Sequence, residues 1–291
     1  MKFKSIIILF NITLLLFLAI LFFLPYFILG SSIIGNSSPL RDIGSGNLAG
    51  PFWRLNLSLV LILALVLITF NVFYFINRKL FMLLEKEDWP ALVRCLEEKI
   101  IQKGNYSSRL VRLLANSYLV LSDSASVMSL ENKTAVAKPS VVDANVLIFG
   151  TARILGKDIS GAVRFFEARK AGVKPGLKDW VSWYHGFALL LNRQYEESGD
   201  EFCALARASK DGIISGLSAF FLADTLAKTT GEKSASFREA SALGRERVLK
   251  SIPGIKDWNR EVSRLSSEIH AAAISKYMED TGRWLYDAKR S

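Results

Sequence analysis

Cysteine and histidine are scarce in this sequence, with two residues of each among 291. A disulfide framework needs several cysteine pairs, so we expect Cys95 and Cys203 to be small buried side chains. Neither His185 nor His270 has a cysteine, aspartate or glutamate at a spacing typical of metal ligands. We therefore predict no metal site.

The motifs of common catalytic families are also missing. There is no phosphate-binding loop and no Gly-x-Ser-x-Gly sequence. The glycine-rich stretch at 44–50 has no strand pattern before it, so it does not have the context of a nucleotide-binding motif. We therefore predict that the protein is not an enzyme, has no catalytic residues and binds no cofactor.

Acidic residues are fewer than basic ones, 27 against 37, which gives a net charge of +10. Residues 1–79 hold six basic residues and one acidic residue and so contribute +5 of this charge. The rest of the chain has no basic stripe interleaved with aromatic residues, as a nucleic-acid-binding surface would have. Attraction to the anionic head groups of a lipid bilayer suffices to explain the charge, and we predict no nucleic-acid partner.

Two long apolar runs account for the positive mean hydropathy of +0.26. They lie at about 5–29 and 54–77, and each is long enough to cross a membrane as a helix. The first run is longer than the roughly 7 to 15 apolar residues of a cleavable signal, so we favour an anchor over a signal. Residues 1–79 are thus predicted to form a membrane anchor of two spans joined by a short polar loop.

Basic residues flank these spans unevenly. Those outside the spans are Lys2, Lys4, Arg78, Lys79, Lys86 and Arg94, whereas the loop and its boundary have Arg41 and Arg54. The positive-inside rule then places both termini in the cytoplasm. We expect an integral protein of a bacterial inner membrane whose remaining domain faces the cytoplasm.

Residues 80–291 show helical periodicity and almost no strand pattern, so the predicted fold class is all-α, with helical repeats over 80–255. Two stretches of this region match at a separation of 36 residues, NVLIFGTARILGKDISGAVRFFEARK and WVSWYHGFALLLNRQYEESGDEFCAL. The match pairs Gly150 with Gly186, Ala152 with Ala188, Leu155 with Leu191, Ala162 with Ser198, and Phe166 with Phe202. Small residues followed by a large apolar one are needed where helices cross closely, so we predict repeated helix hairpins with both glycines at close crossings.

This pattern resembles the tetratricopeptide repeat (TPR) family. The family's small residue on the first helix corresponds to Gly150 and Gly186, its alanine-like residue on the second helix to Ala162 and Ser198, its following aromatic to Phe166 and Phe202, and its closing proline to Pro175. The resemblance implies an α-solenoid of helix hairpins whose first helices line a concave groove for a protein or peptide.

Neighbouring segments extend the resemblance to about residues 80–250. VRLLANSYLVLSD puts Ala115 and Tyr118 at family positions, and Pro139 closes that unit. EDWPALVRCLEEKII has Pro90 in the first turn of a helix, and GLSAFFLADTLAKTTGEKSASFREASALGRERVL gives a helix, a break and a second helix. With two N-terminal spans, the array resembles hypothetical repeat proteins of bacterial inner membranes, including spirochaetal ones.

The last part of the chain, 256–291, is predicted to be one amphipathic helix with Asp257 as its N-cap. Its apolar residues are Trp258, Val262, Leu265, Ile269, Ala273 and Tyr277. Repeat arrays need a terminal unit with one polar face, so we expect a capping helix. The alternative is a helix that binds the membrane surface or a partner.

The repeat register predicts which side chains line the groove: Arg112, Asn116, Leu147, Thr151, Trp183 and Phe187. Mostly apolar groups at these positions favour an apolar ligand such as an amphipathic helix. Burial of the aromatic pair between repeats is an equally good interpretation. The predicted function is a non-catalytic, membrane-anchored scaffold for a protein or peptide. The alternatives are a component of a membrane enzyme or transport complex, using Asn11, Asn56 and Asn71 within the spans, and a structural protein that self-associates.

Overall fold

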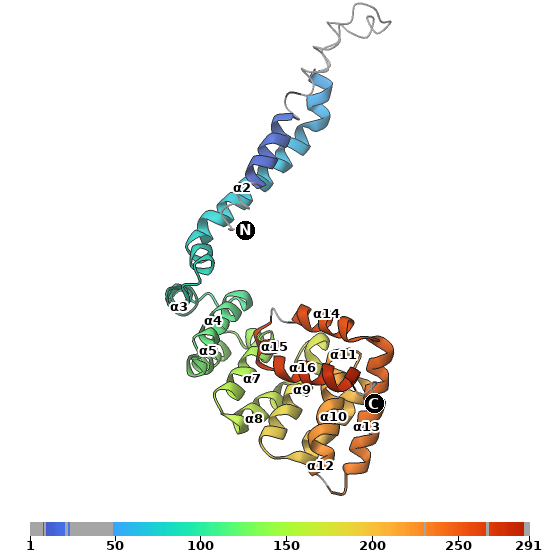
Figure 1. Cartoon of the computed structure of the whole chain (residues 1–291). Coiled ribbons are helices and arrows are strands. Elements are labelled where there is room, and N and C mark those ends of the chain that lie inside the picture. The colour runs from blue at the N-terminus through green and yellow to red at the C-terminus, as the bar shows by residue number, and fades with distance from the viewer. Residues whose placement is uncertain are drawn as a thin grey trace, which may run out of the picture. The chain divides into compact units, whose positions relative to one another are not determined.

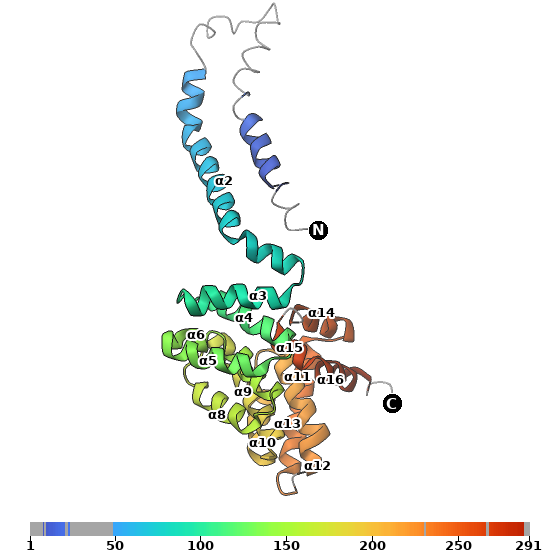
Figure 2. The same cartoon turned by 90° about the vertical axis from the view of Figure 1, so that its left-hand side faces the viewer.

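A computed structural model of the chain describes residues 8, 10–20, 23, 49–229, 231–265 and 268–287. Within these ranges the regular structure is entirely helical, with no strand, and the all-α prediction is confirmed. The chain divides into two compact units, Met1–Leu92 and Val93–Ser291. Figures 1 and 2 show the helices of each unit from two directions.

The first unit is dominated by the long helix α2 (Ala49–Glu85). Its part Leu57–Glu85 contains an 18-residue stretch with a mean hydropathy of 2.8 and is long and apolar enough to cross a membrane, the single such helix in the described residues. Its large side chains are exposed rather than packed in a core, as Leu61, Leu65 and Phe75 illustrate. Of the first predicted span, the structure describes residues 8, 10–20 and 23, which include the apolar helix Phe10–Ile20.

Two asparagines join these apolar helices. The side-chain amide of Asn11 donates to Asn71 Oδ1 at 3.0 Å, and that of Asn71 donates to Asn11 Oδ1 at 2.9 Å. The rings of Phe10 and Phe70 lie beside this pair in sequence, with centroids 4.6 Å apart. Asn11 and Asn71 therefore form hydrogen bonds from helix to helix, whereas the side chain of Asn56 lies outside the described residues.

The second unit is a succession of helices, each packed against its neighbours. The division between the two units falls within α3 (Trp89–Glu97), which the π-helix η2 (Glu98–Gln102) continues. The helices that follow are α4 (Ser108–Val120), α5 (Ser124–Ala137), α6 (Pro139–Asp143), α7 (Val146–Leu155), α8 (Ile159–Arg169), α9 (Pro175–Leu191), α10 (Tyr195–Ala208), α11 (Gly212–Phe221), η3 (Leu222–Leu226), α12 (Ala227–Thr229) and α13 (Ser234–Ser251). Pairs α4/α5, α7/α8 and α9/α10 form hairpins.

One turn geometry recurs at 35- or 36-residue intervals. A residue with a φ of 54° to 62° follows the first helix at four junctions, α2/α3, α4/α5, α7/α8 and α9/α10, namely Glu87, Ser122, Lys157 and Arg193. The next residue then donates its N–H to the carbonyl five positions back, at 2.9 to 3.1 Å, in Asp88 to Leu83, Asp123 to Tyr118, Asp158 to Arg153 and Gln194 to Leu189. This bond satisfies a carbonyl that the helix end would leave free. The repeat is therefore present in the backbone as well as in the aligned side chains.

The carboxylates that follow three of these turns begin the next helix. Asp88, Asp123 and Asp158 accept hydrogen bonds from the N–H groups three residues later, at 3.0 to 3.1 Å. Each bond satisfies one of the free N–H groups in a first helical turn. Turn and cap together fix where the first helix stops and the second starts.

Both glycines of the aligned pair lie at close helix crossings, as predicted. A Cβ built on Gly150 would lie 2.0 Å from Phe166 Cζ, and one on Gly186 would lie 3.1 Å from Phe202 Cε1. Each phenylalanine also stacks on an aromatic ring of the following first helix, Phe166 on Tyr184 and Phe202 on Phe221, with centroids 5.6 Å apart in both cases. The second-helix phenylalanine thus fills the space over glycine and forms the contact to the next hairpin.

The C-terminal segment differs from the single helix that its periodicity predicts. It consists of three helices, α14 (Ile255–Leu265), α15 (Ile269–Ala273) and α16 (Ser275–Asp287). Asp257 lies inside the first turn of α14, because that helix begins at Ile255. Breaks between the helices let Trp258, His270 and Leu285, all buried, each reach the array, which one straight helix could not do.

Candidate partner-binding face

The six predicted groove residues lie on three first helices that are adjacent in the fold. Arg112 and Asn116 are on α4, Leu147 and Thr151 on α7, and Trp183 and Phe187 on α9. Helix α7 packs against both α4 and α9. We call the side formed by α7, α9 and α11 the first-helix face, because it is this side that the C-terminal segment contacts.

Exposure differs sharply among the six residues. Arg112 is exposed and donates from Nε to Asn145 Oδ1 at 3.1 Å. Asn116 is half-buried, and its Oδ1 has no hydrogen-bond partner among the described residues. Leu147, Thr151, Trp183 and Phe187 are all buried. The role of the six in binding a partner stays a prediction.

Trp183 occupies the core between two hairpins. It is completely buried, and its ring centroid lies 5.3 Å from that of Phe187, 6.1 Å from Phe202 and 6.0 Å from Phe221. These partners come from α9, α10 and α11, so the ring holds consecutive helices together. This is the environment described by the second interpretation of the aromatic pair, burial between repeats.

Phe187, by contrast, touches the C-terminal segment. Its ring centroid lies 5.5 Å from that of Tyr277 in α16, and Tyr277 also lies 5.2 Å from Phe221. Helix α16 runs alongside α11, as both views show (Figures 1 and 2). The chain's own C-terminal helix therefore covers this part of the first-helix face.

Helix α15 reaches the same face through His270. The Tyr184 hydroxyl donates to the backbone carbonyl of His270 at 2.8 Å, and the Trp180 ring centroid is 5.3 Å from the imidazole. Burial lowers the pKa of His270 to about 4, and the positive charge of Arg112 acts in the same direction. His270 is consequently neutral at neutral pH.

Trp258 of α14 packs between α11 and α16. A Cβ on Gly216 of α11 would lie 2.9 Å from its ring, and one on Gly282 of α16 would lie 2.8 Å from its Nε1. The indole N–H donates to the carbonyl of Met278 at 3.0 Å. Two glycines on different helices thus make room for one buried tryptophan, which fixes α14 to α16 and to α11.

The end of α16 is held by Arg245 of α13. Its Nη2 donates to the Leu285 carbonyl at 3.1 Å, and its guanidinium lies 5.3 Å from the Trp284 ring centroid. Trp284 and Arg245 also border a cavity of about 590 Å³, whose other lining residues are Ala223, Ala227, Lys228, Arg238, Ser241 and Ala242. The contact combines helix-end capping with a cation over an aromatic ring.

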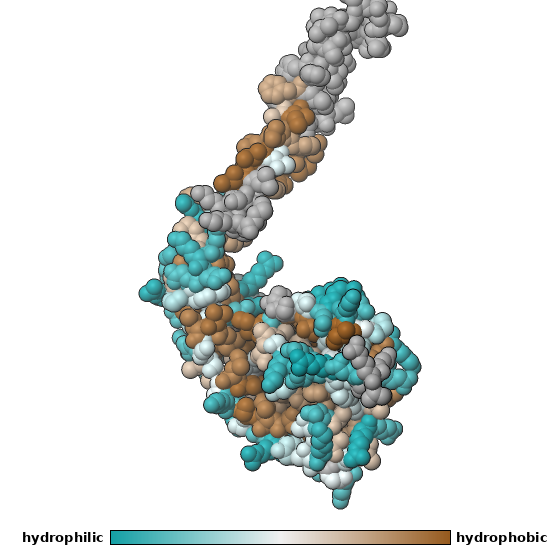
Figure 3. Space-filling view, viewed as in Figure 1, coloured by the Kyte–Doolittle hydropathy of each residue, from teal (hydrophilic) through white to brown (hydrophobic). Residues whose placement is uncertain are grey.

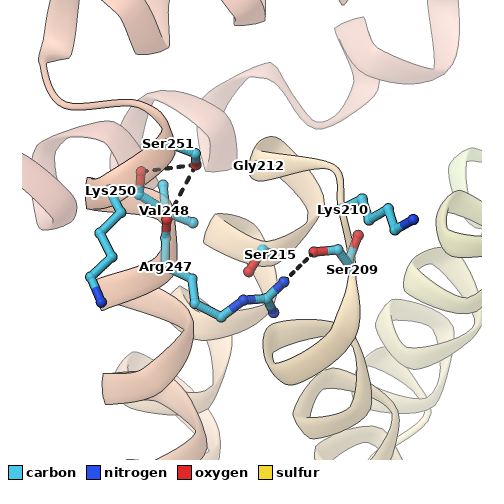
Figure 4. A pocket seen from close by; sticks show the side chains of 8 residues that line it. All are labelled: Ser209, Lys210, Gly212, Ser215, Arg247, Val248, Lys250 and Ser251. Atoms are coloured by element: carbon cyan, nitrogen blue, oxygen red, sulfur yellow. Dashed lines mark hydrogen bonds between the residues drawn. The ribbon is translucent and has the colours of Figure 1, made fainter.

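A second cavity, of about 280 Å³, lies between the start of α11 and the end of α13 (Figure 4). Its central cation, Arg247, donates to the carbonyls of Ala206 and Ser209 at 2.8 Å each. Lys210 and Lys250 extend away from each other in this view. The basic groups therefore do not converge, and Arg247 serves to cap the end of α10.

A buried charge cluster, missed from the sequence, joins α5, α7 and α8. Glu131 is buried and pairs with Arg153 at 2.5 Å and with Arg169 at 3.7 Å. Arg153 also pairs with the capping carboxylate of Asp158 at 3.1 Å, and the Arg169 guanidinium lies 4.1 Å from the Phe165 ring centroid. Such a cluster holds consecutive hairpins in one arrangement, since removing one partner would leave a buried charge unpaired.

A smaller cluster lies around Glu201 of α10. Its carboxylate contacts Lys170 and lies 3.3 Å from His185 Nδ1. Burial raises the pKa of Glu201, but the hydrogen bonds from His185 and Lys170 outweigh this effect and lower it overall. Cys95 and Cys203 are free and buried, as predicted. Among the described residues there is no group of three potential metal ligands.

Two comparisons with known proteins match this chain to proteins of Treponema. The model of a family described as "Uncharacterised Treponema protein" matches residues 126–287, from within α5 to the end of α16. An uncharacterized protein of Treponema pallidum (strain Nichols) is 26% identical over 294 residues, covering 98% of this chain and 88% of that protein. No solved structure matches significantly. The family match includes the C-terminal segment together with the hairpins that it contacts.

Proposed function

We propose that this chain, which belongs to the family described as "Uncharacterised Treponema protein", is a membrane-anchored scaffold. It binds a protein or peptide partner and has no catalytic activity of its own. The observation that carries this proposal is the recurrence of one hairpin design, with the same turn bonds at 35- or 36-residue spacing. Repeated hairpins present an extended surface, which is what proteins of this construction use for binding.

A TPR-like α-solenoid is the architecture that we propose for residues 80–255. It is supported by the small residues Gly150 and Gly186 beneath Phe166 and Phe202, and by the stacking of each phenylalanine on the next first helix. Ser198 is the small residue on the second helix of its hairpin, and its buried hydroxyl donates to the Gly186 carbonyl at 2.8 Å. These are the packing relations that the family resemblance implies.

The anchor is proposed to be a hairpin of two spans. Leu57–Glu85 has the length and hydropathy of a span, and the Asn11 and Asn71 amides supply polar contacts of the kind that join helices in lipid. The charge bias then favours a bacterial inner membrane with both termini in the cytoplasm. A reporter active only in the cytoplasm should work when fused after Ser291 and fail when fused near Ser45; activity of the loop fusion alone would reverse the orientation.

The partner is proposed to bind the groove side of the first helices through mainly apolar contacts. Leu147, Tyr184 and Phe187 make this side apolar and are buried, with α15 over Tyr184 and α16 over Phe187. Arg112 of α4 is an exposed charged group on the same side. An amphipathic helix fits such a surface better than a charged peptide terminus, which would need several converging basic and amide groups.

Affinity capture from detergent-solubilised membranes tests the scaffold. One partner at constant stoichiometry, retained after stringent washing, is the expected result. An Arg112→Glu variant should lower the yield, whereas Lys133→Glu, on the outer side of α5, should leave it unchanged. Recovery of the chain alone as an oligomer would favour a structural, self-associating protein. Recovery with an enzyme or transporter whose activity needs Asn11 or Asn71 would favour a component of that complex.

A further inference from the structure

The C-terminal segment is seated on the first-helix face as a ligand would be. Tyr277 lies on Phe187 and Phe221, the Trp284 ring centroid is 5.9 Å from that of Phe220, and Leu285 Cδ1 would lie 3.6 Å from a Cβ on Gly216. Along α16 these residues are spaced by seven and one, so they share one side of the helix. The other side carries exposed charges, including Arg283 paired with Glu279.

We propose that this segment is an internal ligand, and that the partner carries an amphipathic helix which replaces α16 on the first-helix face. The replacing helix would present an aromatic residue, a small residue five positions later, and Trp and Leu seven and eight positions later, as Tyr277, Gly282, Trp284 and Leu285 do. This inference rests on the proposed scaffold function and adds the chemistry of the partner and a means of regulation.

The hydrogen bonds that hold the segment favour exchange. Tyr184 donates to the His270 carbonyl and Arg245 to the Leu285 carbonyl. Both oxygens belong to the last four residues of their helices, where carbonyls lack partners within the helix. Every helix ends with such carbonyls, so a helix that replaces α16 can accept the bond from Arg245 whatever its sequence. The resident α16 has one further bond from a side chain, because the Tyr286 hydroxyl donates to the Ile252 carbonyl at 2.6 Å.

The ion pairs of the segment also leave it separable from the array. Arg260 pairs with Asp257, Arg264 with Glu261, and Arg283 with Glu279, each three or four residues apart in a single helix. These pairs would persist after displacement. We call the aromatic residues under α16, which are Phe187, Phe220 and Phe221, the seat. Displacement of α16 would expose them, and an aromatic surface is suited to binding a helix of the same pattern.

Part of the apolar surface beside the segment remains open. In Figure 3, apolar side chains gather next to the hydrophilic outer surface of the C-terminal helices, over α5, α7 and α9. A partner helix can make its first contacts there before α16 leaves, because contiguous apolar surface on a folded protein commonly marks a binding site.

The test uses the full chain in detergent micelles and, as probe, a fluorescent peptide with the sequence of residues 275–287. In the wild type, the resident helix competes with the peptide and reduces its apparent affinity in proportion to the open fraction. Leu285→Asp places a charge in the seat and weakens the resident helix, so the peptide should bind about tenfold more tightly or better. Lys276→Asp changes an exposed residue of the same helix and should leave the affinity unchanged.

Hydrogen exchange identifies where the peptide binds. In the wild type, saturating peptide should speed exchange of the α16 amides and leave α7 to α10 protected. Equal peptide affinity for wild type and Leu285→Asp, or binding without faster exchange in α16, would overturn the inference. If Leu285→Asp also loosens the array, Trp284→Ala, which trims a half-buried ring, supplies the same comparison.

Three further outcomes decide the origin of the helix and separate this inference from the scaffold function. Loss of α16 protection on dilution of a dimer would overturn the inference, because a second copy would then supply the segment. Peptide exchange without any captured partner supports the internal ligand and counts against the scaffold. Capture of a partner equally well by wild type and Leu285→Asp supports the scaffold and overturns the internal ligand.

Discussion

Hairpins α7/α8 and α9/α10 are built on one plan with different side chains. Both have glycine under a second-helix phenylalanine, yet a Cβ would lie 2.0 Å from the ring at Gly150 and 3.1 Å at Gly186. The first hairpin has Leu147 and Ala162 where the second has Trp183 and Ser198. The plan therefore fixes which positions must be small or large, while each hairpin fills the remaining volume in its own way.

The largest difference is expected at the pair Trp183 and Leu147. Trp183→Ala removes a completely buried ring between three helices and should lower the free energy of unfolding by about 3 to 5 kcal/mol. Leu147→Ala removes less volume and should cost about 2 to 3 kcal/mol. Thermal unfolding of the full chain, followed by circular dichroism, measures both. An unchanged melting temperature for Trp183→Ala would show that the ring is not core.

Acidification should weaken the packing of α15 on both hairpins, because the His270 imidazole lies against the rings of Trp180 and Tyr184 in the second hairpin and α15 packs against α7 of the first. The folded-state pKa of His270, about 4, lies below its ordinary value of 6.5. Its contribution is fully present above pH 6.5 and is lost as pH falls toward 4, by roughly 2 to 3 kcal/mol at pH 4.5.

A non-titrating variant provides the control for this pH dependence. The difference in unfolding free energy between wild type and His270→Asn should shrink as pH falls from 7 to 4.5. Hydrogen exchange in α15 should increase over the same range in the wild type. A difference that stays constant with pH would show that His270 does not titrate in this window.

Replacing each glycine of the pair by alanine should destabilise the two hairpins to different extents. Gly150→Ala forces the buried Phe166 ring to move and should destabilise the protein by about 1 to 3 kcal/mol. Gly186→Ala needs shifts of only a few tenths of an ångström, and the gain in helix propensity offsets much of its cost. Gly186→Leu should overpack this crossing by about 1 to 3 kcal/mol. Equal effects of the two alanine substitutions would show that the crossings are equally tight.

The smallest effect is expected from replacing Ser198 by alanine, the residue at the equivalent position, Ala162, of the first hairpin. Ser198→Ala copies the first hairpin and removes the buried hydrogen bond to the Gly186 carbonyl, which should cost about 1 kcal/mol. Urea unfolding with sufficient precision can detect this. Leu243→Ala, at an exposed position of α13, should change stability less. A stabilised Ser198→Ala variant would mean that the hydroxyl is poorly satisfied in the fold.

Much of the array could be predicted because its determinants are local. The apolar period of 3.6 gives helices, and Gly150 with Phe166 recurs as Gly186 with Phe202, which marks the crossings before any contact is known. The recurrence of one turn geometry was missed, although Asp88, Asp123 and Asp158 recur at 35 residues and are a signal for a helix start. Their preceding residues, such as Ser122 and Lys157, are not glycine, so nothing marks the positive φ.

The charge cluster and the C-terminal segment could not be predicted in this way. Glu131 and Arg169 are 38 residues apart, and their pairing depends on how two hairpins stack. The apolar spacing from Trp258 to Tyr277 suits one helix, yet Ala273 is exposed and the chain bends to follow the array. Periodicity describes a local segment and carries no information about the curvature of the surface on which it packs.

The sequence by itself determined the helical class, the apolar spanning run, the hairpin unit and the small positions at its crossings, because each depends on residues within about 40 positions of one another. Only the tertiary structure decided that Trp183 is core, that Asn11 bonds to Asn71, and that residues 255–287 cover the first-helix face. These outcomes are set by the close packing of segments far apart in the chain, where one buried ring or amide finds its partner through shape and hydrogen bonding rather than through spacing.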